Sequence, residues 1–181
     1  MLGTYSLQAR ASHLRLFAKS EVIEERGRYS FLGIRQTQSD FEFTVKMSLP
    51  AQANETEAGV LLLQQDDNYL KYTLSGAGDQ TVLKLVLATA TTSPEIIAQH
   101  ALPDYAGEII FKVISKAHRY FYEYSLDDGN TFLSFAGTGA NLILSRGYTG
   151  AYLGFYASNQ GMSTEVYADF DWVRYQGFER G

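Results

Sequence analysis

The sequence contains no cysteine, only three prolines and a single tryptophan. Without cysteine, disulfide bridges and thiolate metal sites are excluded. A net charge of −5 at pH 7 provides no electrostatic attraction toward nucleic acid or an anionic membrane. No apolar run approaches the roughly 20 residues that a membrane-spanning helix needs. We therefore expect neither a nucleic-acid partner nor a membrane partner.

The start of the chain also lacks a targeting signal. Residues 1–17 have no basic region followed by a long apolar core, which is the pattern of a secretory signal peptide. A cytoplasmic location is the expectation. With 181 residues the chain is long enough for one domain with a sizeable core and short for two. No linker-like composition or internal repeat divides it, so we expect a single domain over residues 1–181.

What the sequence has in quantity is tyrosine, phenylalanine and glycine, with 13, 11 and 16 residues. This mixture suits β-strands and tight turns better than helices. Residues 40–49 give the clearest pattern, because Phe41, Phe43 and Val45 alternate with polar residues. Alternation with period two predicts a half-buried antiparallel strand.

Similar runs continue to the end of the chain. Turn-forming stretches separate them, such as QDDN at 65–68 and DDGN at 127–130. No apolar pattern holds a 3.6-residue period over three turns, and residues 19–28 suit a short helix or a polar loop equally. The fold is therefore predicted to be all-β, a jelly-roll-like sandwich of two antiparallel sheets. The further predicted strands are 58–65, 68–76, 81–89, 108–116, 118–126, 131–136, 150–157 and 165–176.

Catalytic motifs are missing from the sequence. It has no phosphate-binding loop, no dinucleotide glycine fingerprint and no H-E-x-x-H motif, and its three histidines are scattered. Glycoside hydrolysis needs only two carboxylates about 5 to 9 Å apart, but no motif selects a pair among the 20 acidic residues. We expect no catalytic centre in this chain alone and no cofactor.

Asp169 and Asp171 are the only candidates for a metal site. At positions i and i+2 of a predicted strand, their carboxylates should point the same way, opposite Ala168, Phe170 and Trp172. A structural calcium ion, with backbone carbonyls completing its shell, would fit this pair. A solvated strand face would fit it equally, as would ion pairs with Arg174 and nearby cations.

Two aromatic segments are candidates for binding. Tyr120, Tyr122 and Tyr124 share one face of a predicted strand, where they either stack on sugar rings or fill the core. Residues 146–158, RGYTGAYLGFYAS, alternate glycines with aromatic side chains. Glycine permits close backbone approach, and tyrosine is enriched at interfaces. We interpret this stretch as a docking edge, with internal packing and direct sugar contact as alternatives.

The order of several segments resembles a known family. They are similar to the C-terminal, concanavalin A-like β-sandwich of family 43 glycoside hydrolases of the β-xylosidase and arabinofuranosidase type, over residues 5–177. The sequence has ARAS where the family usually has a proline–glycine pair, and GIRQ where it has a double arginine. The segments are YSLQARASHLRLF, FLGIRQTQSDFEFTVKMSL, EAGVLLLQQDDNYLKYTL, EYSLDDGNTFLSF, GYTGAYLGFYAS and ADFDWVRYQ.

The resemblance implies a non-catalytic accessory role. In this family the catalytic carboxylates lie in a preceding five-bladed propeller, and the sandwich packs on it and lends a loop that helps close the sugar pocket. Tyr148 is the implied pocket residue, with Tyr152 second, and Arg15 and Arg35 match arginines of the family pattern. The implied partner is a catalytic propeller in cis or in trans, or a second copy of the chain. The alternative is an autonomous carbohydrate-binding module for xylan or arabinan, with a pentose oligosaccharide as ligand.

Overall fold

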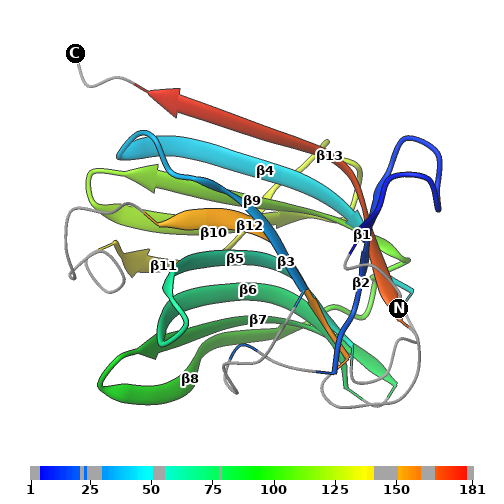
Figure 1. The fold of residues 1–181 in the computed structure, drawn as a ribbon, viewed down its shortest axis with the longest axis horizontal. Coiled ribbons are helices and arrows are strands. Elements are labelled where there is room, and N and C mark those ends of the chain that lie inside the picture. The colour runs from blue at the N-terminus through cyan, green and yellow to red at the C-terminus, as the bar shows by residue number, and fades with distance from the viewer. Residues whose placement is uncertain are drawn as a thin grey trace.

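The computed structural model describes residues 5–20, 23, 30–50, 56–77, 79–140, 151–159 and 166–178. Within them, thirteen β-strands form two antiparallel sheets that pack face to face (Figure 1). The predicted fold class, a two-sheet antiparallel sandwich, is therefore confirmed. In this described part, no helix is long and apolar enough to cross a membrane.

The two sheets have different strand orders. Sheet A has seven strands, in the order β1 (Tyr5–Ser6), β2 (Leu14–Phe17), β13 (Tyr167–Phe178), β4 (Asp40–Ser48), β9 (Glu108–Lys116), β10 (Arg119–Ser125) and β11 (Leu133–Gly139). Sheet B has six, in the order β3 (Ser30–Arg35), β12 (Tyr152–Ser158), β5 (Glu57–Gln65), β6 (Asn68–Ala77), β7 (Gln80–Thr89) and β8 (Thr92–Ala101).

Strand β4 shows how the sequence pattern produces the core. Its alternate residues Phe41, Phe43, Val45 and Met47 are all buried, at 1% exposure or less. The strand pairs with β9 on one side and β13 on the other. Because apolar and polar residues alternate along it, one face packs inward and the other face is polar. The prediction from alternation over residues 40–49 is confirmed.

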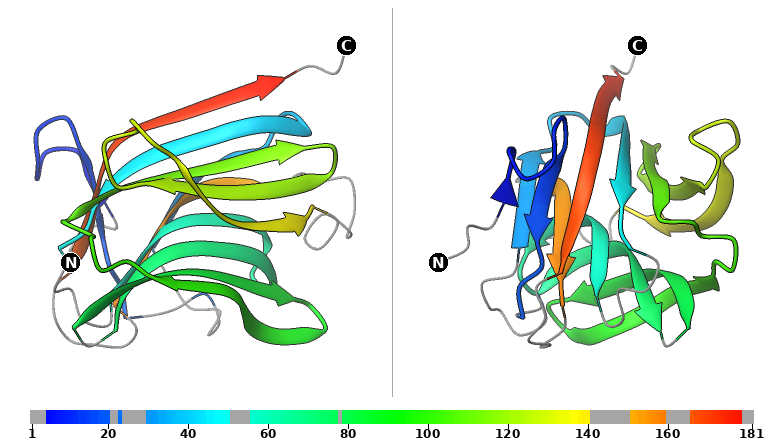
Figure 2. Two further views of the ribbon diagram at one scale, coloured as in Figure 1. Left: turned by 180° about the vertical axis from the view of Figure 1, so that it is seen from behind. Right: turned by 90° about the vertical axis from the view of Figure 1, so that its right-hand side faces the viewer.

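The centre of the core is aromatic and lies between β6 and the β9–β11 part of sheet A. The Tyr72 ring lies 5.0 Å from Phe111, 5.3 Å from Tyr122 and 5.6 Å from Phe135, measured between ring centroids. Its hydroxyl donates a hydrogen bond to the backbone carbonyl of Glu123 at 2.9 Å. A buried polar atom is thus satisfied within the core, and this side of the sandwich is closed. Figure 2 shows the two layers from the side.

The outer face of sheet B carries a second, smaller apolar cluster. Its buried members are Ile23, Leu61, Tyr69, Ala88 and Tyr156. Two of them, Leu61 and Tyr156, belong to the adjacent strands β5 and β12. Sheet B therefore buries apolar side chains on both of its faces.

Four strands, β1, β2, β3 and β8, were missing from the sequence prediction. Strand β8 is exposed along nearly its whole length, so burial imposes no alternation on its sequence, and Pro94 lies within it. Proline is tolerated in edge strands, and β8 is the last strand of sheet B. Strand β3, which contains Gly33, is at the opposite edge of the same sheet. The possible helix at 19–28 lies almost wholly outside the described residues.

The described part of the glycine-rich stretch, residues 151–158, contains the internal strand β12, so the interpretation as a docking edge is wrong for this part. Strand β12 pairs with β3 on one side and β5 on the other, and Leu153 and Tyr156 are fully buried. A Cβ atom at Gly154 would meet the carbonyl oxygen of Leu32 and the Cα atom of Gly33. The close approach that glycine allows is therefore between β12 and β3. Residues 146–150 lie outside the described part.

Candidate functional site

The candidate site arises because sheet A is incomplete beside β13. Strand β2 pairs only with the first part of β13, from Tyr167 opposite Phe17 to Phe170 opposite Leu14. Strand β13 continues to Phe178, and there only β4 pairs with it among the described strands. Among the described residues, one edge of β13 is therefore left without a strand partner beyond Phe170.

A cavity of about 330 Å³ lies at this edge. Its floor is the stacked ring pair of Phe155 from β12 and Phe170 from β13, whose centroids are 4.4 Å apart at an interplanar angle of 18°. Leu7 and Ser12, from the segment between β1 and β2, form one wall. The cavity lining, in full, is Leu7, Ser12, His13, Leu14, Phe155, Phe170, Asp171, Trp172 and Val173.

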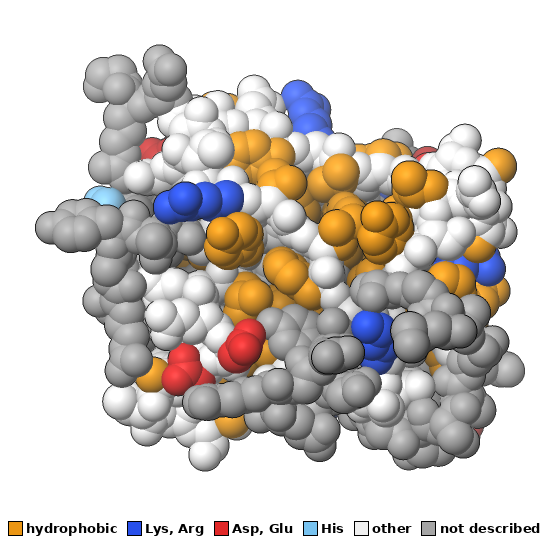
Figure 3. All heavy atoms as spheres, viewed as in Figure 1, with side chains coloured by type: hydrophobic (Ala, Val, Ile, Leu, Met, Phe, Trp, Pro, Cys, Tyr) orange, Lys and Arg blue, Asp and Glu red, His pale blue; other side chains and the backbone are white. Residues whose placement is uncertain are grey.

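Strand β3 extends the apolar surface beyond the cavity. Leu32 and Ile34 are the cross-strand partners of Phe155 and Leu153, so they project from the same side of sheet B as these core residues. They are nevertheless 38% and 49% exposed, which shows that sheet A does not cover them. Figure 3 shows hydrophobic side chains gathered on the side of the molecule where β3 lies in front.

We call this surface the apolar notch. Its base is the Phe155–Phe170 ring pair, and its exposed side chains come from three separate parts of the chain. The exposed members are Leu7, Leu32, Ile34, Trp172 and Val173, with exposures between 38% and 67%.

A β-bulge in β13 places two of these side chains. The pairing with β4 passes from Phe170 opposite Met47 to Val173 opposite Val45, so Asp171 and Trp172 both lie opposite Lys46. The extra residue shifts the alternation of the strand. Trp172 is 41% exposed at the notch, whereas the sequence pattern placed it on the same face as the buried Phe170. Trp172 nevertheless lines the same hollow as Phe170.

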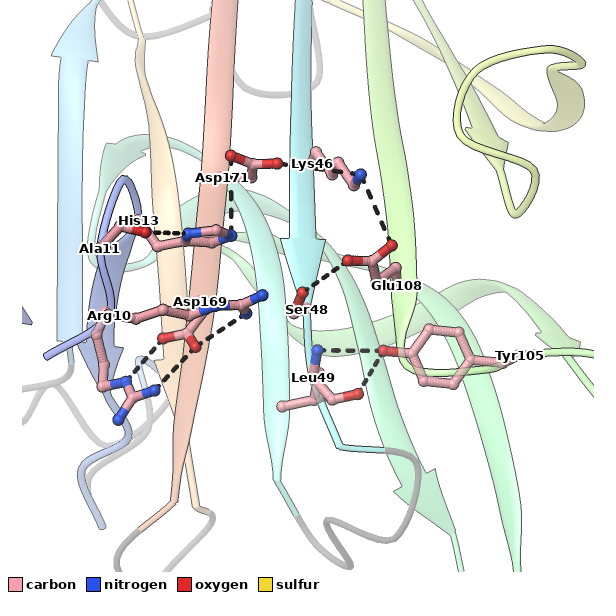
Figure 4. Close-up of polar contacts among 11 residues, drawn as sticks. Arg10, Ala11, His13, Lys46, Ser48, Leu49, Tyr105, Glu108, Asp169 and Asp171 are labelled. Atoms are coloured by element: carbon pink, nitrogen blue, oxygen red, sulfur yellow. Dashed lines mark hydrogen bonds and ion pairs between the residues drawn. The ribbon is translucent and has the colours of Figure 1, made fainter.

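The end of β2 is fastened to β13 by a charged cluster (Figure 4). Arg15 donates two hydrogen bonds to the Asp169 carboxylate, at 2.8 and 3.0 Å, and Arg10 donates a third at 3.3 Å. Burial by itself raises the pKa of Asp169, but the hydrogen bonds from Arg15 and Arg10 outweigh it and lower the pKa below its ordinary value of 3.8. Arg15 also lies 3.6 Å above the Tyr167 ring.

A second charged cluster surrounds Lys46 on the outer face of sheet A. Its ammonium group lies 2.8 Å from Asp128, 3.6 Å from Glu108 and 4.0 Å from Asp171. A hydrogen bond from this ammonium group to Asp128 raises the pKa of Lys46, against the opposing effect of burial. Asp171 also lies 3.8 Å from His13, which lines the notch.

These contacts bear on the predicted calcium site at Asp169 and Asp171. Both oxygens of Asp169 accept hydrogen bonds from guanidinium groups, and Asp171 lies between His13 and Lys46. Within the described ranges no group of three or more His, Cys, Asp or Glu residues could hold a metal ion. The arrangement favours ion pairs over calcium. The arginine partners of Asp169 are Arg10 and Arg15, whereas the predicted partner Arg174 donates a hydrogen bond to Gln176.

The structure decides between the two interpretations of Tyr120, Tyr122 and Tyr124, and sugar binding by these residues is wrong. Tyr120 and Tyr122 are fully buried and Tyr124 is 5% exposed, so these rings lie in the core and offer no surface to a sugar. The Tyr122 hydroxyl shares a hydrogen bond of 3.1 Å with Thr138. Burial raises the pKa of both Tyr120 and Tyr122 well above the ordinary range. These three tyrosines therefore fill the core of the sandwich.

The residues implied by the family resemblance lie in different places. Tyr148 is outside the described residues. Tyr152 is 44% exposed and is the cross-strand partner of the exposed Arg35, so these two residues lie together on the outer face of sheet B. Arg15 is engaged within the domain by Asp169. The roles of Tyr148, Tyr152 and Arg35 in a sugar pocket remain predictions.

Sequence reasoning did not identify the notch residues. Leu32 and Ile34 alternate with Phe31 and Gly33, which is the only signal in the sequence that they share a face. Their exposure depends on where β2 begins, and no local pattern reports that. The exposure of Trp172 was not predicted either, because the bulge next to it is invisible in the sequence.

Known proteins resemble this chain over nearly its whole length. A family model described as the beta xylosidase C-terminal concanavalin A-like domain matches residues 2–176. Among curated proteins, a non-reducing end alpha-L-arabinofuranosidase from Bacteroides ovatus is 25% identical over 174 residues, which are 95% of this chain and 32% of that protein. A xylosidase/arabinosidase from Butyrivibrio fibrisolvens is 26% identical over 169 residues, covering 93% of this chain and 32% of that protein.

Two solved structures differ in how much of their chain this sandwich covers. A GH43 protein from Bacillus licheniformis superposes with a TM-score of 0.86 at 25% identity, over 97% of this chain and 35% of that one. A Saccharomyces cerevisiae protein described as functionally unknown superposes with a TM-score of 0.71 at 14% identity, and there 91% of the chain is covered. The chain thus spans about a third of the curated relatives, and in the yeast structure the same fold makes up almost a whole chain.

Proposed function

Because this chain belongs to the family of β-xylosidase C-terminal concanavalin A-like domains, we propose that it is an accessory sandwich of a glycoside hydrolase of family 43. It packs on a catalytic propeller, in cis or in trans, and supports the hydrolysis that the propeller performs. The family match over residues 2–176 is the observation that carries this proposal.

The size of the relatives supports an accessory role. The two curated relatives carry the names of an arabinofuranosidase and a xylosidase/arabinosidase, and this chain corresponds to only 32% of each. In each of them most of the polypeptide therefore lies outside the part that matches this sandwich. Terminal α-arabinofuranosyl or β-xylosyl groups are the substrate class that these names suggest.

The contribution of the sandwich to catalysis is indirect. In this proposal Tyr152, at the start of β12, and Arg35, at the end of β3, help to wall a sugar pocket in the neighbouring domain. The two residues are exposed cross-strand partners, and Tyr148, the other pocket residue that the family resemblance implies, lies outside the described residues. In this proposal the sandwich helps to exclude water and to position the terminal sugar, while the carboxylates that react belong to the propeller.

Co-purification with the cognate catalytic domain tests the accessory role. The chain is expressed with the family 43 catalytic domain that its own genome supplies, and the pair is analysed by size-exclusion chromatography. Hydrolysis of 4-nitrophenyl xyloside and arabinofuranoside is then measured with and without the chain. We expect a 1:1 complex and a higher kcat/KM when the chain is present, and a reduced gain for Tyr152→Ala.

Two results would contradict the proposal. One is the absence of a complex together with an unchanged kcat/KM of the catalytic domain. The other is calorimetric heat from the chain alone on titration with xylo-oligosaccharides or arabinan, without any complex, which would support the autonomous carbohydrate-binding module instead.

A further inference from the structure

We infer that the apolar notch is the surface that docks the catalytic domain, and that it does so by receiving apolar side chains from that domain between β3 and β13. This inference rests on the proposed function and adds the location and the chemistry of the contact.

The exposed apolar side chains of the notch form one continuous surface. Leu32 lies opposite Phe155 across the β3–β12 pair, and Phe155 stacks on Phe170, which is followed in β13 by the exposed Trp172 and Val173. Soluble domains do not usually leave a contiguous apolar surface of this kind in water unless it is used for binding. Scattered single hydrophobic residues elsewhere on the molecule need no such explanation.

The shape of the notch suits an anchoring contact. A hollow of about 330 Å³ with a stacked aromatic floor can accept a large apolar side chain from a partner. Residues that carry most of an interface's binding energy fill pockets of this kind and are surrounded by a rim that excludes water. His13 and Asp171, 3.8 Å apart, supply a polar part of such a rim.

The position of β1 identifies the catalytic domain as the occupant. The matched family is described as a C-terminal domain, and in the curated relatives about two thirds of the polypeptide lies outside the match. Leu7, the residue directly after β1, and Ser12, from the same segment before β2, form one wall of the hollow. A domain joined ahead of β1 therefore emerges beside the notch, and the tether raises its effective concentration there.

The opposite edge of sheet B does not combine these features. Strand β8 also exposes two isoleucines, Ile96 and Ile97, at 51% and 37%. However, it carries Pro94 and Glu95. Proline and charged residues in an edge strand hinder its pairing with a strand of another chain. It is also the strand of sheet B farthest from β3 in the strand order.

Charge substitutions in the notch test the inference. Ile34→Asp, Val173→Asp and the double variant are compared with Ile96→Asp, which places the same charge at an equally exposed isoleucine on β8. Affinity for the cognate catalytic domain is measured by calorimetry. We expect each notch variant to bind about 10-fold more weakly, the double variant about 100-fold more weakly, and the control within about twofold of the wild type.

The outcomes separate the two proposals. If the wild-type chain does not bind the catalytic domain, the accessory role itself fails. If it binds and the notch variants bind equally well, the docking surface lies elsewhere and this inference alone is overturned. It is also overturned if light scattering shows a dimer of the chain that the notch variants dissociate while binding to the catalytic domain is unchanged.

Thermal unfolding of each variant guards against a loss of fold. Should an aspartate variant unfold, Ile34→Ser and Val173→Ser replace it, since both side chains are about half exposed and serine removes the apolar contact without adding a charge. Folded serine variants with wild-type affinity would overturn the inference as well.

Discussion

The two sides of this sandwich use the same kinds of side chain in opposite ways. On the β6–β10 side, Tyr72, Phe111 and Tyr122 are fully buried between the sheets, and the Tyr72 hydroxyl finds a backbone acceptor. On the β3–β13 side, Ile34 and Val173 project from the inward faces of their sheets yet are about half exposed. The first side is completed by the chain itself, and the second is left open.

This difference locates the interaction surface where the architecture is incomplete. Hydrophobicity alone would not distinguish the two sides, because both are apolar. What distinguishes the two sides is how far the strands of sheet A extend. Strands β9, β10 and β11 pack over β6, whereas β2 pairs with only the first four residues of β13. An inward-facing residue that lacks a covering strand is thus a better marker of a docking surface than aromatic content.

The largest expected effect comes from the closed side. Tyr72→Ala removes a fully buried ring and its hydrogen bond, so the free energy of unfolding should fall by about 3–5 kcal/mol. Ile34→Ala on the open side should change it by less than about 1 kcal/mol. Urea unfolding of the isolated chain measures both. Equal losses would mean that the open side is as important for folding as the closed one.

An intermediate effect is expected at the strand pair that builds the open side. Gly154→Ala forces a Cβ atom against the β3 backbone at Leu32 and Gly33, and we expect a loss of about 1–3 kcal/mol in the free energy of unfolding. Gly137→Ala in β11 is the matched control, because its new Cβ atom would have ordinary contacts no closer than 3.7 Å. Chemical denaturation should show the control within about 0.5 kcal/mol of the wild type. A neutral Gly154→Ala variant would show that β3 can shift.

The smallest expected effect concerns the ion pairs that hold β2 at the edge of the notch. Asp169→Asn weakens charge-assisted hydrogen bonds from Arg15 and Arg10 and should lower the free energy of unfolding by about 1–2 kcal/mol at pH 7. Asp128→Asn, at a carboxylate whose side chain is 70% exposed, should cost less than about 1 kcal/mol.

The Asp169 prediction has a definite pH dependence. The folded-state pKa of this carboxyl is lowered, so its contribution is fully present above its ordinary pKa of 3.8 and is lost as the pH falls through the lower folded value. The difference in Tm between the wild type and Asp169→Asn should therefore shrink below about pH 4. A difference that stays constant down to pH 2 would show that the carboxylate charge is not what stabilises this edge.

Much of the fold could be read from the sequence, because burial on one face forces alternation. Strand β9 has the bounds that were predicted, and β4 differs by one residue, since both have one face in the core. Strand β8 was missed because it is an edge strand that is exposed along nearly its whole length. Neither of its faces has to be apolar, so its sequence shows no alternation. Strand β3 is short, and a central glycine interrupts its pattern.

The candidate site was much less accessible to sequence reasoning. The tyrosines at 120, 122 and 124 suited a sugar platform or the core, and the sequence could not decide because their exposure depends on whether sheet B covers them, which it does. The carboxylates of Asp169 and Asp171 looked like metal ligands because their guanidinium and imidazole partners come from a segment about 150 residues earlier in the chain. Such partners follow from topology, which a local pattern does not encode.

The four-residue length of β2 has a further consequence. A few alternating apolar and polar residues inserted ahead of Leu14 would lengthen β2, so that it pairs with more of β13 and covers Leu32 and Ile34. Such a variant would bury these two side chains and remove part of the surface that we infer binds the catalytic domain. The start of β2 is therefore the position at which a short insertion would convert the open side of this sandwich into a closed one.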